Sequence, residues 1–132
     1  MVLGAMFQAD FQLVRVVDPL QSAGRDADGF LISGLAPEGL KRLQEEAEVY
    51  LEKVADRFRS RSLQVVTRLL VSSQTATAIL EQASSTPTDV IALETHGHGG
   101  LTRFFLGSVS DKVLRGATIP VLVHRPLSEE EK

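Results

Sequence analysis

Residues 89–126 read as a strand, a glycine-rich loop, a helix and a second strand in succession, DVIALETHGHGGLTRFFLGSVSDKVLRGATIPVLVHRP. A short apolar run of strand length, residues 90–93, opens the stretch. Glycines in the following loop let the backbone turn sharply and approach a ligand closely. A helix then begins, and the free backbone N–H groups at a helix start favour phosphate. This layout is how an open parallel sheet builds an anion site.

The helix after the loop is predicted from apolar residues at helical spacing: Val109, Val113, Leu114 and Ala117. Ser108 follows Gly107 and is expected to be the N-cap. Asp111 lies at the distance of a capping box, although Asp is weaker there than Glu. Ser108 is therefore interpreted as a binding residue, a capping residue, or both.

The stretch resembles the C-terminal part of the universal stress protein family, whose nucleotide-binding signature is G-x2-G-x9-G-[S/T]. Gly97, Gly107 and Ser108 match its last three fixed positions. Residues 113–123 look like the family's ending and residues 13–19 like its second strand, so the resemblance covers nearly the whole chain. It implies an α/β fold, an open parallel sheet with helices on both faces, adenine nucleotide alpha hydrolase-like, in a single domain of residues 1–132.

Two departures from the family pattern bear on the nucleotide site. Glu94 replaces the first glycine of the signature, and its carboxylate should repel a triphosphate unless it is turned away or bound to a metal. The N-terminus is expected to be incomplete, because the family's first strand, with its adenine-recognising Asp, has no match and residues 1–8 resemble only the end of the first helix. That strand would be the middle one of the sheet order 3-2-1-4-5.

Three arrangements would accommodate the missing strand. In the first, which we favour, Met1 is internal to a longer protein, because it falls inside an amphipathic pattern. A contracted four-stranded sheet, in which the family's second and fourth strands pair directly, is the second choice. In the third arrangement a partner chain supplies the strand.

The composition fits one globular domain and excludes several functions. With 43% hydrophobic and 23% charged residues the chain is close to average globular usage. A net charge of −3 gives no basic footprint, so we predict no nucleic-acid binding. No apolar run approaches the roughly 20 residues that span a membrane, and no secretory signal opens the chain, so we predict no membrane partner and a cytoplasmic location. The absence of cysteine excludes disulfides and thiolate metal sites.

The rest of the chain alternates strand and helix patterns, which indicates an α/β fold. Residues 20–37 read as a long connection, in which the fragment Asp26-Ala-Asp28-Gly29 is interpreted as a solvated turn rather than a calcium loop. The helix over residues 38–59 has a core stripe of Leu40, Leu43, Ala47, Leu51, Val54 and Phe58. The other predicted elements are strands at 11–17 and 63–71 and a helix at 75–83.

No catalytic residue and no metal site are predicted. His96, His98 and His124 would need to converge with a carboxylate such as Glu94 to hold a metal. The resemblance instead implies that His96 orients the loop by hydrogen bonding, and His98 is expected to face solvent or phosphate. Because Ser108 lacks the turn of a nucleophile elbow and no general base is positioned, slow ATP hydrolysis is the most that we expect.

The resemblance implies an adenine nucleotide, ATP or a relative, with or without Mg²⁺. The residues expected to bind it are Val16 on the base or ribose side, and Gly97, His98, Gly107, Ser108 and Val109 near the phosphates. The alternative is a nucleotide-independent, dimerising interaction module with a degenerate site, and a small hydrolase is a third reading. A homodimer is predicted through the apolar last strand, Val121, Leu122 and Val123, because an edge strand invites pairing with a second copy.

Overall fold

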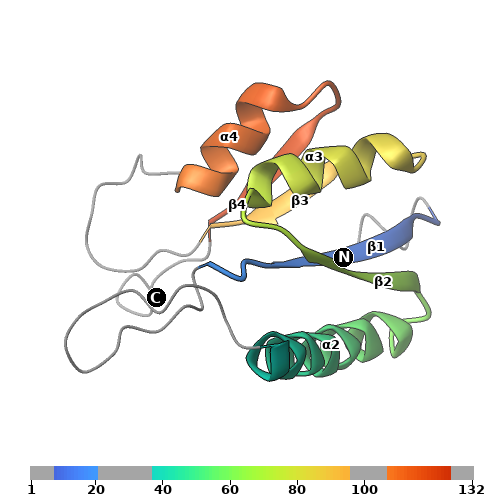
Figure 1. The fold of residues 1–132 in the computed structure, drawn as a ribbon. Helices are drawn as coiled ribbons and strands as arrows, with labels where there is room; N and C mark the ends of the chain where they lie inside the picture. The colour runs from blue at the N-terminus through green and yellow to red at the C-terminus, as the bar shows by residue number, and fades with distance from the viewer. Residues whose placement is uncertain (1–7, 21–36, 96–106, 126–132) are drawn as a thin grey trace, which may run out of the picture. The chain divides into compact units, whose positions relative to one another are not determined.

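The structure is a computed structural model that describes residues 8–20, 37–95 and 107–125. The expectations for residues 1–7, for the calcium-like fragment, and for the loop with His96, Gly97 and His98 lie outside the described residues. The described elements are β1 (Asp10–Val17), α2 (Pro37–Arg59), β2 (Gln64–Val71), α3 (Thr75–Ser85), β3 (Ile91–Glu94), α4 (Ser108–Gly116) and β4 (Val121–His124). Strands and helices alternate as the sequence predicts (Figure 1).

The chain divides into two compact units, Met1–Gln74 and Thr75–Lys132. In the first unit β1 pairs in parallel with β2, and in the second β3 pairs in parallel with β4. The described strands form two sheets of two strands each, so the single contracted sheet considered from the sequence is not seen among them. Parallel strands joined through helices confirm the predicted α/β class.

The first unit is held together by α2, which packs against β1 and β2 (Figure 1). Its buried residues are Ala47, Leu51 and Ala55, which are 4%, 5% and 0% exposed. Ala47 and Leu51 belong to the predicted core stripe, whereas Ala55 was not predicted. The stripe ends at Phe58, whose ring packs edge-on against Phe11 of β1 with the centroids 5.1 Å apart. Sequence periodicity therefore identified the face of α2 that covers the sheet.

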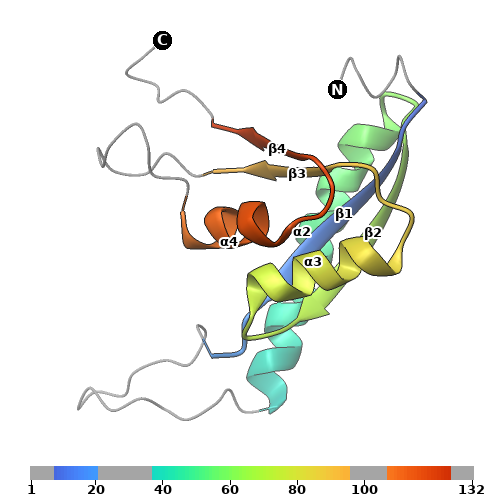
Figure 2. The ribbon, with the colours of Figure 1, turned by 90° about the horizontal axis from the view of Figure 1, so that it is seen from above.

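The core of the second unit is centred on Val113, which is fully buried and contacts the cluster of Ala76 and Ile91. Figure 2 shows α3 and α4 side by side next to β3 and β4. A Cβ on Gly116 would lie 2.6 Å from Leu80 Cδ1, so the glycine allows α4 to approach α3 closely. Leu114, which follows Val113 in the apolar pattern that predicted this helix, is 37% exposed. Successive helical residues point about 100° apart, so the burial of Val113 turns Leu114 outward.

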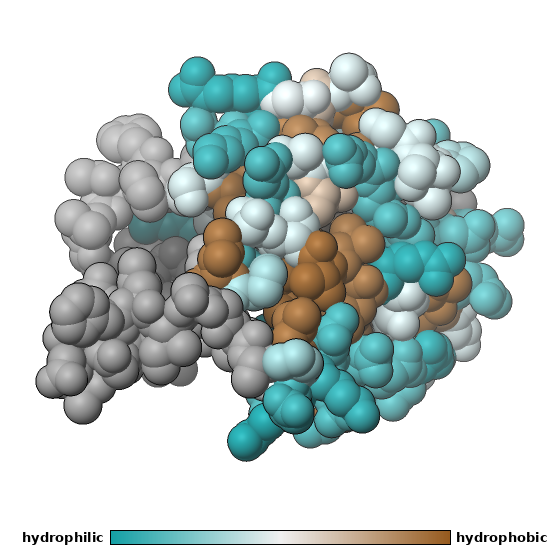
Figure 3. All heavy atoms as spheres, viewed as in Figure 1, coloured by the Kyte–Doolittle hydropathy of each residue, from teal (hydrophilic) through white to brown (hydrophobic). Residues whose placement is uncertain are grey.

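Several large apolar side chains of the described residues are exposed: Leu20, Val49, Tyr50, Val66, Val71, Val90, Leu114 and Leu122. On the face drawn in Figure 3, hydrophobic residues gather in a patch that hydrophilic residues surround. Leu122 of β4 is 60% exposed, while its neighbours Val121 and Val123 are half-buried. None of the described helices is long and apolar enough to cross a membrane.

Candidate functional site

The start of α4 carries the clearest local geometry of the predicted site. Gly107 occupies the N-cap position with φ 80° and ψ 154°, a backbone region essentially restricted to glycine. Its carbonyl accepts the backbone N–H of Asp111 at 3.0 Å. The prediction that Ser108 is the N-cap is therefore wrong, because Ser108 is already the first residue of the helix. The conformation that begins the helix requires a residue without a Cβ, and this requirement places the boundary at Gly107.

The predicted capping box is also absent from the start of α4. No side chain bonds to the cap, and the Asp111 carboxylate instead accepts the Nε–H of Arg115 at 3.0 and 3.1 Å. The first N–H groups of a helix have no partner within the helix, and here the cap residue has no side chain to supply one. The first turn of α4 thus offers N–H donors and the positive end of the helix dipole to an anion.

Space for close approach exists beside Gly107. A Cβ built on this residue meets no heavy atom of the described residues within 4 Å. Ser108 is exposed, so its hydroxyl is available together with its N–H. Val109 packs its side chain against the core around Val113, which leaves only its backbone for a ligand. Gly107, Ser108 and Val109 are therefore suited to hold an oxyanion through backbone N–H groups.

Glu94 ends β3 directly opposite His124 of β4. Its carboxylate Oε2 lies 4.0 Å from His124 Nδ1, and the two side chains are 61% and 70% exposed. The pairing continues one residue further, because the buried Thr95 donates its N–H to the His124 carbonyl at 2.9 Å. The Glu94 carboxylate thus has a cationic neighbour on β4 whenever the imidazole is protonated.

Metal ligation finds little support in the described residues. They contain no group of three or more His, Cys, Asp or Glu side chains that could hold a metal ion. Glu94 and His124 supply two such groups, and two ligands fall short of the three or four in protein zinc sites. His96 and His98 lie outside the described residues.

A pocket of about 280 Å³ lies in the first unit, between the end of β1 and the first half of α2. Its lining residues are Arg15, Val16, Val17, Asp18, Leu43, Glu46, Ala47 and Tyr50. The guanidinium carbon of Arg15 stands 4.8 Å from the centroid of the Tyr50 ring. No local sequence pattern indicates this pair, because its members are far apart in the chain and meet only when α2 packs on β1.

The structure brings some of the predicted nucleotide ligands together. Gly107, Ser108 and Val109 are consecutive at the start of α4 in the second unit, whereas Val16 lines the pocket of the first unit. Gly97 and His98 lie outside the described residues. The described residues that were predicted to bind phosphate are therefore consecutive in one short segment.

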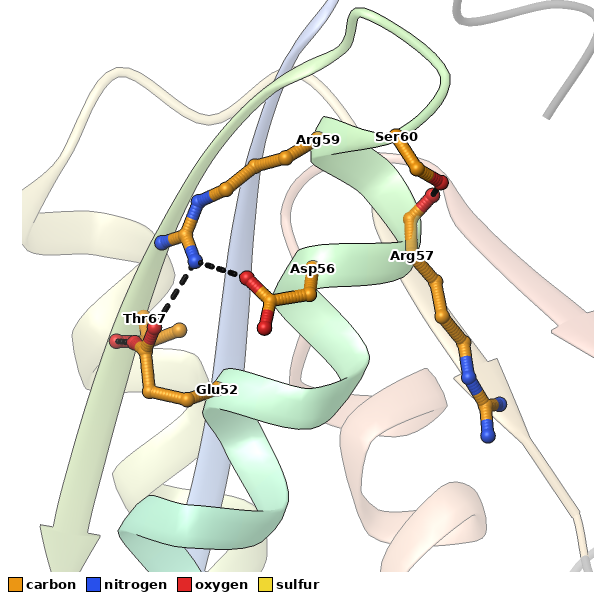
Figure 4. A network of polar contacts seen from close by, with 6 residues as sticks. All are labelled: Glu52, Asp56, Arg57, Arg59, Ser60 and Thr67. Atoms are coloured by element: carbon orange, nitrogen blue, oxygen red, sulfur yellow. Dashed lines mark hydrogen bonds and ion pairs between the residues drawn. The ribbon is translucent and has the colours of Figure 1, made fainter.

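A polar network lies at the C-terminal end of α2 and includes none of the predicted ligands (Figure 4). Arg59 Nη1 donates to Glu52 Oε2 and Asp56 Oδ1 at 2.9 Å each, and Thr67 Oγ1 of β2 donates to Glu52 Oε1 at 3.1 Å. The hydrogen bond from Arg59, followed by that from Thr67, lowers the pKa of Glu52 below its ordinary value of 4.5. The same contacts with Glu52 and Asp56 raise the pKa of Arg59. The network links α2 to β2 and is structural.

The chain belongs to the universal stress protein family, whose model matches residues 2–125. It is 33% identical to Universal stress protein MJ0531 of Methanocaldococcus jannaschii, over 94% of this chain and 69% of that protein. It is 36% identical to Universal stress protein Rv2005c of Mycobacterium tuberculosis, but over 63% of this chain and only 28% of that longer relative.

Solved structures agree with this assignment at the level of the fold. The structure of hypothetical protein MJ0577 matches with a TM-score of 0.71 and 22% sequence identity. The match covers 91% of this chain and 78% of the MJ0577 chain. A universal stress protein family member from Burkholderia pseudomallei has a TM-score of 0.67 at 23% identity, covering 93% and 79%. These neighbours confirm the adenine nucleotide alpha hydrolase-like fold.

Proposed function

We propose that this chain binds ATP or a related adenine nucleotide and acts in the stress response by binding rather than by catalysis. The observation that carries the proposal is the start of α4, where Gly107 adopts a glycine-only conformation and no side chain caps the helix. Because oriented N–H groups at a helix start attract anions, this segment fits a phosphate. Membership of the universal stress protein family supports the same assignment.

Each described residue has a limited role in this proposal. The N–H groups of Ser108 and Val109 donate to phosphate oxygens, and Gly107 keeps the approach free of a side chain. Val16 contacts the base or ribose. A bound Mg²⁺ would supply further charge neutralisation for the phosphates. In this proposal the nucleotide serves as a signal rather than a substrate, in a protein that we place in the cytoplasm.

We propose further that the two units form one domain of residues 1–132 and that β1 corresponds to the family's second strand. The pairs β1–β2 and β3–β4 are those that remain when the middle strand is taken from the order 3-2-1-4-5. The presence of β1 at Asp10–Val17 does not by itself identify which family strand it is. Under our assignment the adenine-recognising Asp of the family's first strand has no counterpart in β1.

The alternative is a nucleotide-independent interaction module that dimerises through β4. Two observations favour it: Glu94 stands in place of the first signature glycine, and Leu122 of β4 is 60% exposed. A short apolar strand with an unpaired edge is suited to pairing with a second copy, and such an interface would be isologous.

Calorimetric titration with ATP and Mg²⁺ tests the proposal on the parent and on Glu94→Gly. Saturable binding by the parent supports nucleotide binding and means that the Glu94 carboxylate is tolerated beside His124. Binding by the variant alone assigns the loss to the carboxylate and supports a degenerate site. No binding by either protein, with both folded by circular dichroism, refutes the proposal in favour of the interaction module.

A further inference from the structure

The pocket between β1 and α2 carries charges of both signs around an aromatic ring. Arg15 lies near the end of β1 and Asp18 directly follows the strand, while Glu46 and Tyr50 come from one face of α2, four residues apart. At about 280 Å³ it lies just below the range of roughly 300–1,000 Å³ that is typical of ligand sites. The pocket is therefore of a size for a small metabolite rather than a macromolecule.

Arg15 is held in a position to bind a carboxylate. Its guanidinium carbon lies over the Tyr50 ring, 4.8 Å from the ring centroid, in a cation–π contact. The in-plane N–H donors point along the edges of the guanidinium, where they match a carboxylate in a two-bond arrangement. Arg15 forms no ion pair with another described residue.

Glu46 provides a charge of the opposite sign on the same lining. Its Oε1 accepts the Nε–H of Arg42 at 3.1 Å, and its side chain remains 61% exposed. A carboxylate has about four acceptor sites over its two oxygens, so Glu46 retains capacity for a second donor. Asp18 adds a second carboxylate, whose Oδ1 accepts the Leu20 N–H at 2.8 Å. An anion alone would meet repulsion from these groups, whereas a ligand with both charges would satisfy Arg15 and Glu46 together.

The remaining lining is apolar. Val17 and Ala47 are 8% and 4% exposed, and Leu43 is half-buried one turn before Ala47 on α2. These side chains add hydrocarbon surface to the same lining. We propose that this pocket binds a small zwitterion of the α-amino-acid class with an apolar side chain, its carboxylate on Arg15 and its ammonium on Glu46. This site goes beyond the proposed nucleotide function, and it shares with it Val16, which that proposal places on the base or ribose side.

Three probes separate the parts of the proposed ligand: leucine, 4-methylpentanoate, which lacks the ammonium, and isoamylamine, which lacks the carboxylate. Each probe is titrated into the full chain, and binding is measured by calorimetry and by backbone amide NMR shifts. Leucine should bind about tenfold or more tightly than either half-molecule, since each lost charge removes a charge-assisted hydrogen bond. The shifts should centre on residues 15–18 and 43–50.

Matched variants assign the two charges. Arg15→Gln should weaken leucine binding about tenfold or more and leave isoamylamine unchanged. Arg68→Gln is the control, because Arg68 is an exposed arginine opposite Val14 in the parallel pairing and so lies on the other face of the same sheet. Glu46→Gln should weaken leucine and leave 4-methylpentanoate unchanged, with Glu48→Gln of the same helix as its control.

The proposal fails if the folded parent shows no saturable response to leucine, or if a half-molecule binds as tightly as leucine. It also fails if Arg15→Gln and Arg68→Gln reduce leucine binding equally. An ATP titration of each variant separates the two proposals, because the proposed phosphate ligands are the N–H groups of Ser108 and Val109, which none of these variants changes. Val16 is common to both proposed sites, so saturating leucine should weaken ATP binding only if the base reaches this pocket. Loss of one activity can therefore be distinguished from loss of the other.

Discussion

The burial of Val113 predicts that truncating its side chain destabilises the second unit. Val113→Ala removes two buried methyl groups, which costs about 1.6 kcal/mol at about 0.8 kcal/mol per group. The side chain is fully buried among Ala76 and Ile91, so incomplete collapse around the cavity should raise the loss to about 2–3 kcal/mol. The better helix propensity of alanine offsets less than about 0.7 kcal/mol. We expect a net loss of about 2 kcal/mol.

Urea denaturation followed by far-ultraviolet circular dichroism measures this loss. Val90→Ala is the matched control, because Val90 belongs to the same unit, has the same side chain and is 52% exposed. Its truncation should cost about 0.8 kcal/mol or less, since about half of its surface is already in water. Equal losses for the two variants would refute the reasoning, because they would mean that burial in this unit does not determine its stability.

Three further predictions concern the polar network, the start of α4 and the edge of β4. The pKa of Glu52 is lower in the folded state, so its contribution to stability is present above the unfolded pKa and is lost as the pH falls through the folded pKa. Glu52→Gln should therefore reduce the decrease of the urea midpoint between about pH 7 and about pH 3. Glu48→Gln is the control and should leave this decrease unchanged. Gly107→Ala should lower stability by about 1–3 kcal/mol and weaken ATP binding, and an unchanged ATP isotherm would exclude Gly107 from the site. Leu122→Lys should shift the mass in sedimentation toward monomer while Val66→Lys does not, and a dimer that survives Leu122→Lys argues against the β4 interface.

The sequence predicted the described elements to within a few residues where the periodic pattern is long. The helix expected over 38–59 is α2, Pro37–Arg59, and the strand expected over 63–71 is β2, Gln64–Val71. In both cases the repeat of apolar residues follows directly from which face is buried. In α4, which has nine residues, the pattern predicted the helix but not its buried side: Val113 is buried, whereas the adjacent Leu114 is 37% exposed.

The start of α4 shows why a correct motif can still give a wrong cap. Serine is a favourable N-cap in general, so local preference pointed to Ser108. The observed positive φ of Gly107 is a backbone property, and it becomes visible only when the preceding chain direction is known. The motif G-[S/T] was nevertheless informative, because the glycine supplies the turn and the serine supplies an exposed first-turn residue.

Contacts between distant residues lay beyond the sequence pattern. Glu94 meets His124 because β3 and β4 pair in a register that no local pattern specifies, and a shift by one residue would place the two side chains on opposite faces. Arg15 meets Tyr50 only through the rotation of α2 about its axis. Both pairs contain ionisable side chains, so the ionisable neighbour of Glu94 and the aromatic neighbour of Arg15 could be identified only from the tertiary structure.

The phosphate part and the base part of the proposed nucleotide site differ in how many contacts define them. The phosphate part, Gly107 to Val109, lies within one segment, and its donors are set by the helix itself. The base side rests on Val16 in the other unit, and an apolar side chain alone gives little discrimination among ligands. Inorganic tripolyphosphate should therefore retain a measurable part of the affinity for ATP. If tripolyphosphate binds as tightly as ATP, the base contributes nothing and the site is a general polyphosphate site; if only ATP binds, recognition depends on contacts beyond the start of α4.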